Sequence, residues 1–371
     1  MLYHLFTWIE NLYSPPGFGI VRFLTFRSAA AAITALLISF WLGPKIIALL
    51  KKNQIGESAK LEAPKNHLSK AGTPTMGGLI VLTALLLPVI LWSNLQNIYV
   101  QLILFVTIGM GIVGFIDDYL KVKKKKEKGL IGWYKIIGQF AVGIVFGLIL
   151  MNSNELTSIN AATITTVPFL KDINFDLTYF YLPVVVFIII ATSNAVNLTD
   201  GLDGLAIGTV GIVGLTLGVI CYISGNIELS NYLNIIFLRG NGELAIFCAA
   251  LGGAALGFLW FNSYPAQVFM GDTGSLALGG AIGAITIMVK KEFILPILGG
   301  IFFIETLSVI IQRLYFKYTK KKYGQGRRIF LMAPLHHHFE LKGIPEPKIV
   351  TRFYIIAILL MIISLTTFKV R

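Results

Sequence analysis

Long apolar stretches alternate with short polar segments along almost the whole chain. Most of these stretches hold about 17 to 25 residues, the length that an α-helix needs to cross the hydrocarbon core of a bilayer. The pattern predicts ten spanning helices, with approximate limits at 29–50, 76–93, 98–116, 134–152, 179–197, 204–224, 243–261, 275–289, 292–312 and 350–368. Only Lys290 and Lys291 lie between the limits of the eighth helix and the ninth, which begins with Glu292, so these two helices are compatible with a tight hairpin.

The composition supports a membrane protein. Of the 371 residues, 56% are hydrophobic and 13% are charged, and the mean hydropathy is +0.77. These values are typical of integral membrane proteins and not of soluble domains. We therefore predict one all-α, polytopic helical bundle over residues 1–371. Within it, residues 1–28 form an external segment whose "YHLFTWIENLY" stretch is expected to lie as a helix at the membrane interface.

The distribution of basic residues predicts the orientation. Cytoplasmic loops retain lysine and arginine, and most of the 31 lysines and arginines lie in 51–75, 117–135 and 313–349. Both termini are then external, and the cytoplasmic loops are 51–75, 117–133, 198–203, 262–274 and 313–349. The basic run "KVKKKKEK" at 121–128 lies beside a span, where it is expected to attract anionic lipid headgroups. We do not expect nucleic-acid binding.

Five aspartates lie on the predicted cytoplasmic face, although the orientation was derived from lysine and arginine alone. They are Asp117, Asp118, Asp200, Asp203 and Asp272. Carboxylates near hydrocarbon are costly and usually functional. Asp117 and Asp118 follow a helix that runs toward the cytoplasm, where the helix dipole disfavours acids. This placement favours a bound cation.

The other polar motifs on this face suit phosphate or sugar. If the sixth helix begins near Thr199, Asp200 and Asp203 share one of its faces, and N-capping explains only one of them. Asp272 in "MGDTGS" precedes a helix start that offers free N–H groups. Lys70 and Thr75 lie just before the second span. Each of these motifs also has an ordinary interpretation as a helix cap or a solvated loop.

Three further motifs are less specific. The tract His336-His337-His338 lies near Arg327 and Arg328 without a nearby cysteine, so phosphate or sugar binding is favoured over a transition metal, with a solvated tract as the alternative. Glu305 lies within a span and is expected to face the interior, with its role open. "GMGIVG" at 109–114 matches a dinucleotide-binding pattern but lies in a span, where it indicates helix packing.

Taken together, these motifs resemble the polyprenyl-phosphate N-acetylhexosamine-1-phosphate transferases, from about residue 20 to the C-terminus. The "PLHHHFE" stretch is similar to the phospho-N-acetylmuramoyl-pentapeptide transferases within that group. The resemblance implies Mg²⁺-dependent transfer of phospho-N-acetylmuramoyl-pentapeptide from its UDP carrier to undecaprenyl phosphate, with release of UMP, for peptidoglycan synthesis. It also implies a bacterial cytoplasmic membrane and an active site that faces the cytoplasm.

The resemblance assigns a role to each motif. Asp117 and Asp118 would lie near the acceptor phosphate, and Asp272 would be the principal Mg²⁺ ligand, with Asp203 as a second one. The histidines His336 and His337 would flank the diphosphate. The residues implied for the nucleotide-sugar site are Lys70, Thr75, Asn197, Asp200, Gly201, Asp203, Asn262, Phe269, which would stack on uracil, and His338.

Several alternatives stay open at this point. A sister enzyme that uses UDP-N-acetylglucosamine would share the aspartates, and a transporter would place its polar groups near the bilayer midplane. Asp117 could act as a base or by positioning, and a covalent aspartyl intermediate is a third route. The Gly-x-x-x-Gly spacings within the spans are compatible with a homodimer.

Overall fold

The computed structural model describes the whole chain except residues 14–15, 53–71, 124–129, 131, 169–173 and 369–371. The N-terminal half comprises α1 (Leu2–Tyr13), η1 (Phe18–Arg22), α2 (Leu24–Lys52), α3 (Gly78–Trp92), α4 (Ile98–Lys123), α5 (Gly132–Met151), α6 (Asn154–Thr157), β1 (Ile164–Thr166), β2 (Asn174–Asp176) and η3 (Thr178–Phe180). The C-terminal half comprises α7 (Tyr181–Thr199), α8 (Leu205–Ser224), α9 (Ile227–Tyr232), η4 (Asn241–Glu243), α10 (Leu244–Asn262), α11 (Gly271–Met288), η5 (Glu292–Ile294), α12 (Leu295–Leu298), α13 (Gly300–Tyr323), α14 (Leu335–Leu341) and α15 (Glu346–Thr366).

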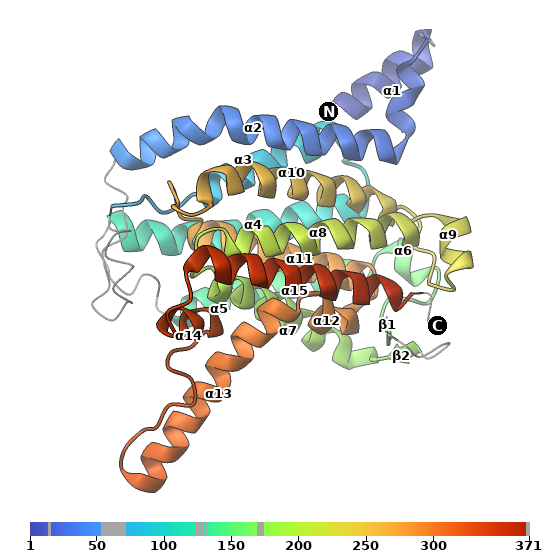
Figure 1. Cartoon of the computed structure of the whole chain (residues 1–371). Helices are drawn as coiled ribbons and strands as arrows, with labels where there is room; N and C mark the ends of the chain where they lie inside the picture. The colour runs from blue at the N-terminus through green and yellow to red at the C-terminus, as the bar shows by residue number, and fades with distance from the viewer. Residues whose placement is uncertain (14–15, 53–71, 124–129, 131, 169–173, 369–371) are drawn as a thin grey trace.

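The long helices lie side by side in one bundle, which confirms the predicted polytopic helical fold (Figure 1). Each of the ten predicted apolar stretches contains one long helix or, for the ninth, a broken pair. In the described part of the chain, seven helices are long and apolar enough to cross a membrane, and the broken pair makes up to eight. The N-terminal stretch that was predicted to form an interfacial helix is also helical and corresponds to α1.

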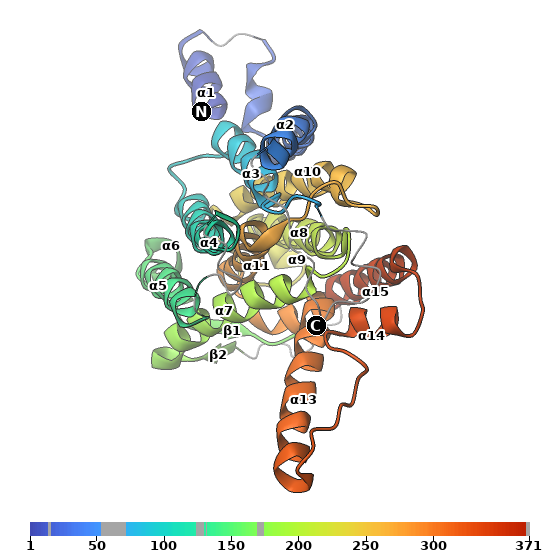
Figure 2. The same cartoon turned by 90° about the vertical axis from the view of Figure 1, so that its left-hand side faces the viewer.

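Helix α11 is the centre of the bundle. It packs against α3, α4, α7 and α8, and every residue from Asp272 to Met288 is buried (Figure 2). Small side chains permit this close packing: a Cβ on Gly114 of α4 would overlap the backbone of Asp272. The prediction that "GMGIVG" packs helices is confirmed, and the same contact sets α4 directly against the start of α11.

Several predicted boundaries were wrong. Helix α4 continues to Lys123, so Asp117 and Asp118 lie in its last turns and not in a loop. Lys121 pairs with Asp117 one turn away, an arrangement that stabilises the extra helical turns. The ninth span is broken after Leu298, and α13 leaves the bundle at 82° to the preceding segment (Figures 1 and 2).

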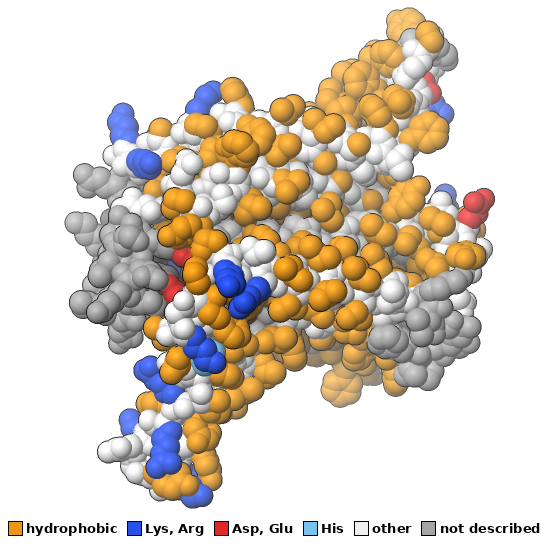
Figure 3. All heavy atoms as spheres, in the orientation of Figure 1, with side chains coloured by type: hydrophobic (Ala, Val, Ile, Leu, Met, Phe, Trp, Pro, Cys, Tyr) orange, Lys and Arg blue, Asp and Glu red, His pale blue; other side chains and the backbone are white. Residues whose placement is uncertain are grey.

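The two ends of the bundle differ in chemistry. At one end lie α14 and the junctions that carry the predicted site, and lysine and arginine side chains gather there and along α13 (Figure 3). Hydrophobic side chains cover most of the face between the ends. At the opposite end lie α6, α9 and a short antiparallel hairpin of β1 and β2, which the all-α prediction did not include.

Candidate active site

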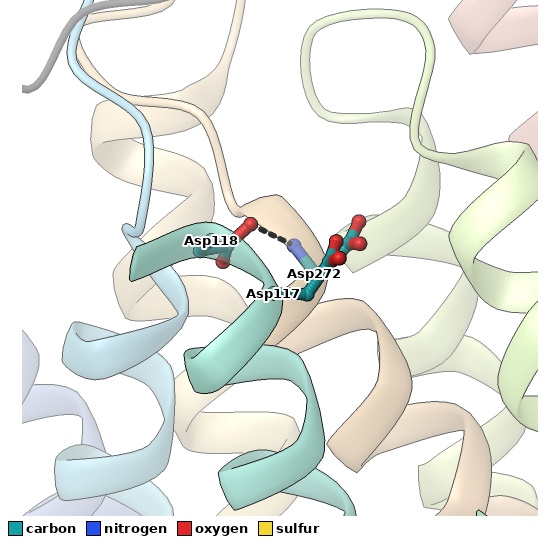
Figure 4. Close-up of side chains that lie close together, drawn as sticks. All are labelled: Asp117, Asp118 and Asp272. Atoms are coloured by element: carbon teal, nitrogen blue, oxygen red, sulfur yellow. Dashed lines mark hydrogen bonds between the residues drawn. The ribbon is translucent and has the colours of Figure 1, made fainter. Parts of the chain in front are cut away.

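The structure brings three of the five aspartates together. Asp117 and Asp118 in the last turns of α4 face Asp272 in the first turn of α11 (Figure 4). All three are buried, and each offers a carboxylate oxygen within 4.8 Å of the others. Three oxygen donors at this spacing suit a hard divalent cation such as Mg²⁺.

Asp118 fixes the start of α11. Its Oδ1 accepts the N–H of Asp272 at 3.1 Å, and its Oδ2 accepts the N–H of Thr273 at 2.8 Å and the Thr273 hydroxyl at 2.6 Å. The first N–H groups of a helix have no partner within it. We expected these groups to be free for an anionic ligand, but an acid from another helix caps them instead. Asp272 itself lies within the helix and not before it.

Two lysines neutralise the other two carboxylates. Lys121 lies between Asp117 and Asp272, with its Nζ 2.9 Å from Asp272 Oδ2, and Lys135 of α5 reaches the same oxygen at 2.8 Å. Buried carboxylates require such compensation. The sequence argument missed both lysines and assigned Lys121 to the lipid-binding basic run. Its position four residues after Asp117 is the signal that was available.

Asn197 links α7 to this centre. Its Nδ2 donates to Asp272 Oδ1 at 2.7 Å and to the hydroxyl of Ser275 at 2.8 Å. Asn197 is the third-last residue of α7, so it lies directly before the loop that carries Asp200 and Asp203. The prediction that this asparagine belongs to the same site as Asp272 therefore agrees with the geometry.

Asp200 and Asp203 do not share a helix face. Helix α8 begins at Leu205, after Gly204 adopts a left-handed conformation with φ of 82°, so both acids lie in the loop. The Asp203 backbone N–H donates to Glu346 at 2.6 Å, and its Oδ2 accepts the N–H of Ala266 at 2.9 Å. Asp203 is not part of the three-aspartate cluster.

The segments that carry Asn262, Phe269 and Thr75 frame the same end of the bundle. Asn262 accepts the N–H of Gly204 at 3.1 Å and donates to Val268 O at 2.8 Å, which ties two loops together. The N–H of Phe269 donates to Pro74 O at 2.8 Å, next to Thr75. A Cβ on Gly271 would lie 2.8 Å from Asp118 and 3.1 Å from the Thr75 hydroxyl. Lys70 lies outside the described residues.

The three histidines occupy different environments on α14. His336 is fully buried, and a Cβ on Gly201 would overlap its Nε2. His337 Nδ1 lies 3.1 Å from Glu340, and His338 Nδ1 accepts the N–H of Leu331 at 3.1 Å. A solvated histidine tract is thus excluded for His336, which packs against the Asp200–Gly204 loop.

The comparisons with known proteins agree with this geometry. The model of glycosyl transferase family 4 matches residues 100–290, and signature 1 of the phospho-N-acetylmuramoyl-pentapeptide transferases matches residues 70–82. Phospho-N-acetylmuramoyl-pentapeptide transferases of Chlorobaculum parvum and Chlorobaculum tepidum are 52% and 53% identical over 371 residues, with 100% of each chain covered. That of Flavobacterium psychrophilum is 46% identical over 409 positions, again with complete coverage.

Proposed function

Because the chain belongs to the phospho-N-acetylmuramoyl-pentapeptide transferase family, within glycosyl transferase family 4, we propose that it transfers phospho-N-acetylmuramoyl-pentapeptide from UDP-N-acetylmuramoyl-pentapeptide to undecaprenyl phosphate. The products are the undecaprenyl diphosphate-linked precursor lipid I and UMP. The chain is thus a multi-pass membrane transferase of peptidoglycan synthesis. The observation that carries the proposal is the buried cluster of Asp117, Asp118 and Asp272 at the lysine-rich end of the bundle.

Magnesium is the metal that this cluster fits best. The donors are carboxylate oxygens, without cysteine or histidine among them, and Mg²⁺ commonly takes one or two carboxylates together with substrate phosphates. Asp272 and Asp117 would hold the ion, because both oxygens of Asp118 accept hydrogen bonds from the start of α11, whereas Asp117 and Asp272 are paired with flexible lysine side chains. When bound, the ion would neutralise phosphate charge. Asp203 stays a prediction as a second ligand.

The chain's own residues place the two substrates on either side of this cluster. Lys121 and Lys135 supply fixed positive charge for phosphate oxygens, as phosphoryl transfer demands. The nucleotide-sugar would occupy the surface formed by the loop at 200–204, the segment at 262–269 and α14. Undecaprenyl phosphate would enter laterally from the membrane toward Asp117. Of the residues predicted for the nucleotide-sugar site, Asp200, Gly201 and Asp203 lie in this loop, Asn262 and Phe269 lie in this segment, and His338 lies on α14.

The cytoplasmic placement of the site is also part of the proposal. The lysine-rich end of the bundle is the end that carries the aspartate cluster, and the rule that basic loops stay in the cytoplasm puts that end inside the cell. The soluble nucleotide-sugar then reaches the site directly from the cytosol. A transporter is disfavoured, because the acids lie at helix ends and not at the middle of the bundle.

The decisive experiment measures UMP release by the purified protein with undecaprenyl phosphate and Mg²⁺. UDP-N-acetylmuramoyl-pentapeptide is expected to support turnover and UDP-N-acetylglucosamine is not. Asp272→Asn is expected to lose about a hundredfold or more of the activity, because it removes a carboxylate that would hold the metal ion. Turnover with UDP-N-acetylglucosamine alone would identify the sister enzyme instead, and solute uptake without UMP release would identify a transporter.

A further inference from the structure

Glu305 is a buried acid that the proposed reaction does not use. It is the sixth residue of α13, beyond the 82° bend, and its side chain is fully buried. A carboxylate in this position is expensive unless another group compensates for it. Its partner therefore indicates why the chain keeps an acid here.

That partner is His336 at the start of α14. Glu305 Oε1 accepts the backbone N–H of His336 at 3.2 Å, and Glu305 Oε2 lies 3.3 Å from the ring Nδ1 of the same residue. The acid thus contacts both the main chain and the ring of one histidine. Nδ1 and Glu305 Oε2 face each other without hydrogen-bond geometry, and neither atom has another hydrogen-bond partner among the described residues, so the two groups are neighbours whose relative position the backbone hydrogen bond sets.

The opposite edge of the ring faces the loop between α7 and α8. A Cβ on Gly201 would overlap His336 Nε2 and lie 2.9 Å from Cε1, so only glycine permits this approach. His336 Nε2 is buried and has no hydrogen-bond partner among the described residues. The ring is therefore a spacer held between Glu305 on one side and the backbone of Gly201 on the other.

We propose that Glu305 is a positioning residue which, through His336, sets the Asp200–Gly204 loop against α14 and so shapes the nucleotide-sugar side of the active site. This inference rests on the proposed function for the identity of the substrate. It assigns Glu305 no contact with the reacting atoms. Glu305 acts only by holding His336 on α14, the helix that also carries His337 and His338.

The role predicts a selective kinetic defect. Glu305→Gln keeps an oxygen for the backbone N–H of His336 but removes the negative charge beside Nδ1. The KM for UDP-N-acetylmuramoyl-pentapeptide is expected to rise about tenfold, with an unchanged KM for undecaprenyl phosphate. Glu305→Asp restores the charge on a shorter side chain and is expected to recover part of the loss. A merely structural role would reduce the amount of folded enzyme and leave both KM values unchanged.

A double-mutant cycle tests the same contact from the other side. Gly201→Ala pushes on the His336 ring that Glu305 holds, so its effect on nucleotide-sugar KM is expected to be non-additive with that of Glu305→Gln. Glu346→Gln, which loosens the same loop through the Asp203 N–H, provides the comparison variant and is expected to be closer to additive. Additive effects of Glu305→Gln and Gly201→Ala, or equal changes in both KM values, would overturn the proposal.

A binding measurement separates this inference from the proposed reaction. Isothermal titration with uridine diphosphate is expected to show about tenfold weaker binding to Glu305→Gln than to the wild type, with partial recovery in Glu305→Asp. Absent UMP release together with this binding pattern would contradict the proposed reaction and keep the positioning role. Equal uridine diphosphate affinity in wild type and Glu305→Gln would contradict the positioning role, whatever the turnover.

Discussion

Asp118 holds Asp272 in place through the main chain, because its Oδ1 accepts the Asp272 N–H at 3.1 Å while its Oδ2 caps Thr273. One carboxylate thus completes the start of the central helix α11, whereas the carboxylates of Asp117 and Asp272 pair with lysine side chains. The two adjacent acids on α4 therefore have different tasks. Asp118 acts mainly through helix geometry and Asp117 through charge.

This division predicts different phenotypes for the two acids. Asp118→Ala leaves buried N–H groups at the start of α11 without a partner and should lower the free energy of unfolding by about 1–3 kcal/mol. UMP release should fall with it, since Asp272 is displaced. Asp117→Asn should abolish most activity with a much smaller change in stability. Thermal unfolding in detergent and UMP release test both variants, and equal destabilisation by the two would contradict the division.

The contact between Gly114 and the backbone of Asp272 provides a second prediction. Gly114→Ala introduces a methyl group where the α4 and α11 backbones meet, and overpacking of this kind costs about 1–3 kcal/mol. The variant should also lose activity, because Asp272 moves away from Asp117. Gly132→Ala at the start of α5 is the matched control, since a Cβ there meets nothing within 4 Å. Equal activity in both variants would show that the close approach is unimportant.

Much of the site was predictable because each aspartate ends an apolar run, and successive spans alternate in direction. That argument placed Asp117, Asp118 and Asp272 at one end of the bundle without any contact information. It did not predict which acids would meet. Asp203 and Asp272 were expected to share a metal, whereas the described cluster consists of Asp272 and the α4 pair.

The remaining features depend on contacts between distant segments, which hydrophobic periodicity does not predict. Lys135 reaches Asp272 across 137 residues, and Glu305 meets His336 across 31. The bend before α13 was also not predictable from a proline at the break, because the two residues that connect the helices there are Gly299 and Gly300. Hydropathy predicts that a segment is apolar but not that it leaves the bundle.

The burial of Lys290 predicts how the stability of the protein changes with pH. Lys290 lies in the turn after α11, is fully buried, and donates to the Tyr181 hydroxyl at 2.7 Å and to Ala162 O at 3.0 Å. Burial lowers the pKa of Lys290 from 10.5 to about 8. Between these pH values the unfolded chain binds more protons than the folded one, so the contribution of Lys290 to stability should rise with pH, by roughly 3 kcal/mol in total.

The measurement is thermal unfolding of the wild type and Lys290→Met as a function of pH. The difference in stability between the two should be constant below pH 8 and should shift in favour of the wild type as the pH rises toward 10.5. If the stabilities of the wild type and Lys290→Met change in parallel over this whole pH range, the folded protein does not destabilise the cationic form of Lys290.

The protonation chemistry of Asp117 is open to a direct test. A phosphate monoester has its second pKa near 6, so the acceptor is mostly dianionic at neutral pH and needs little help from a base. The Asp117 carboxylate is also engaged, since it accepts the N–H of Leu130 at 2.7 Å and pairs with Lys121. We therefore expect Asp117→Asn, like Asp272→Asn, to show a constant deficit in UMP release from about pH 6 to about pH 9, because charge and position are lost at every pH. Strong recovery of Asp117→Asn alone as the pH rises would instead identify Asp117 as the base.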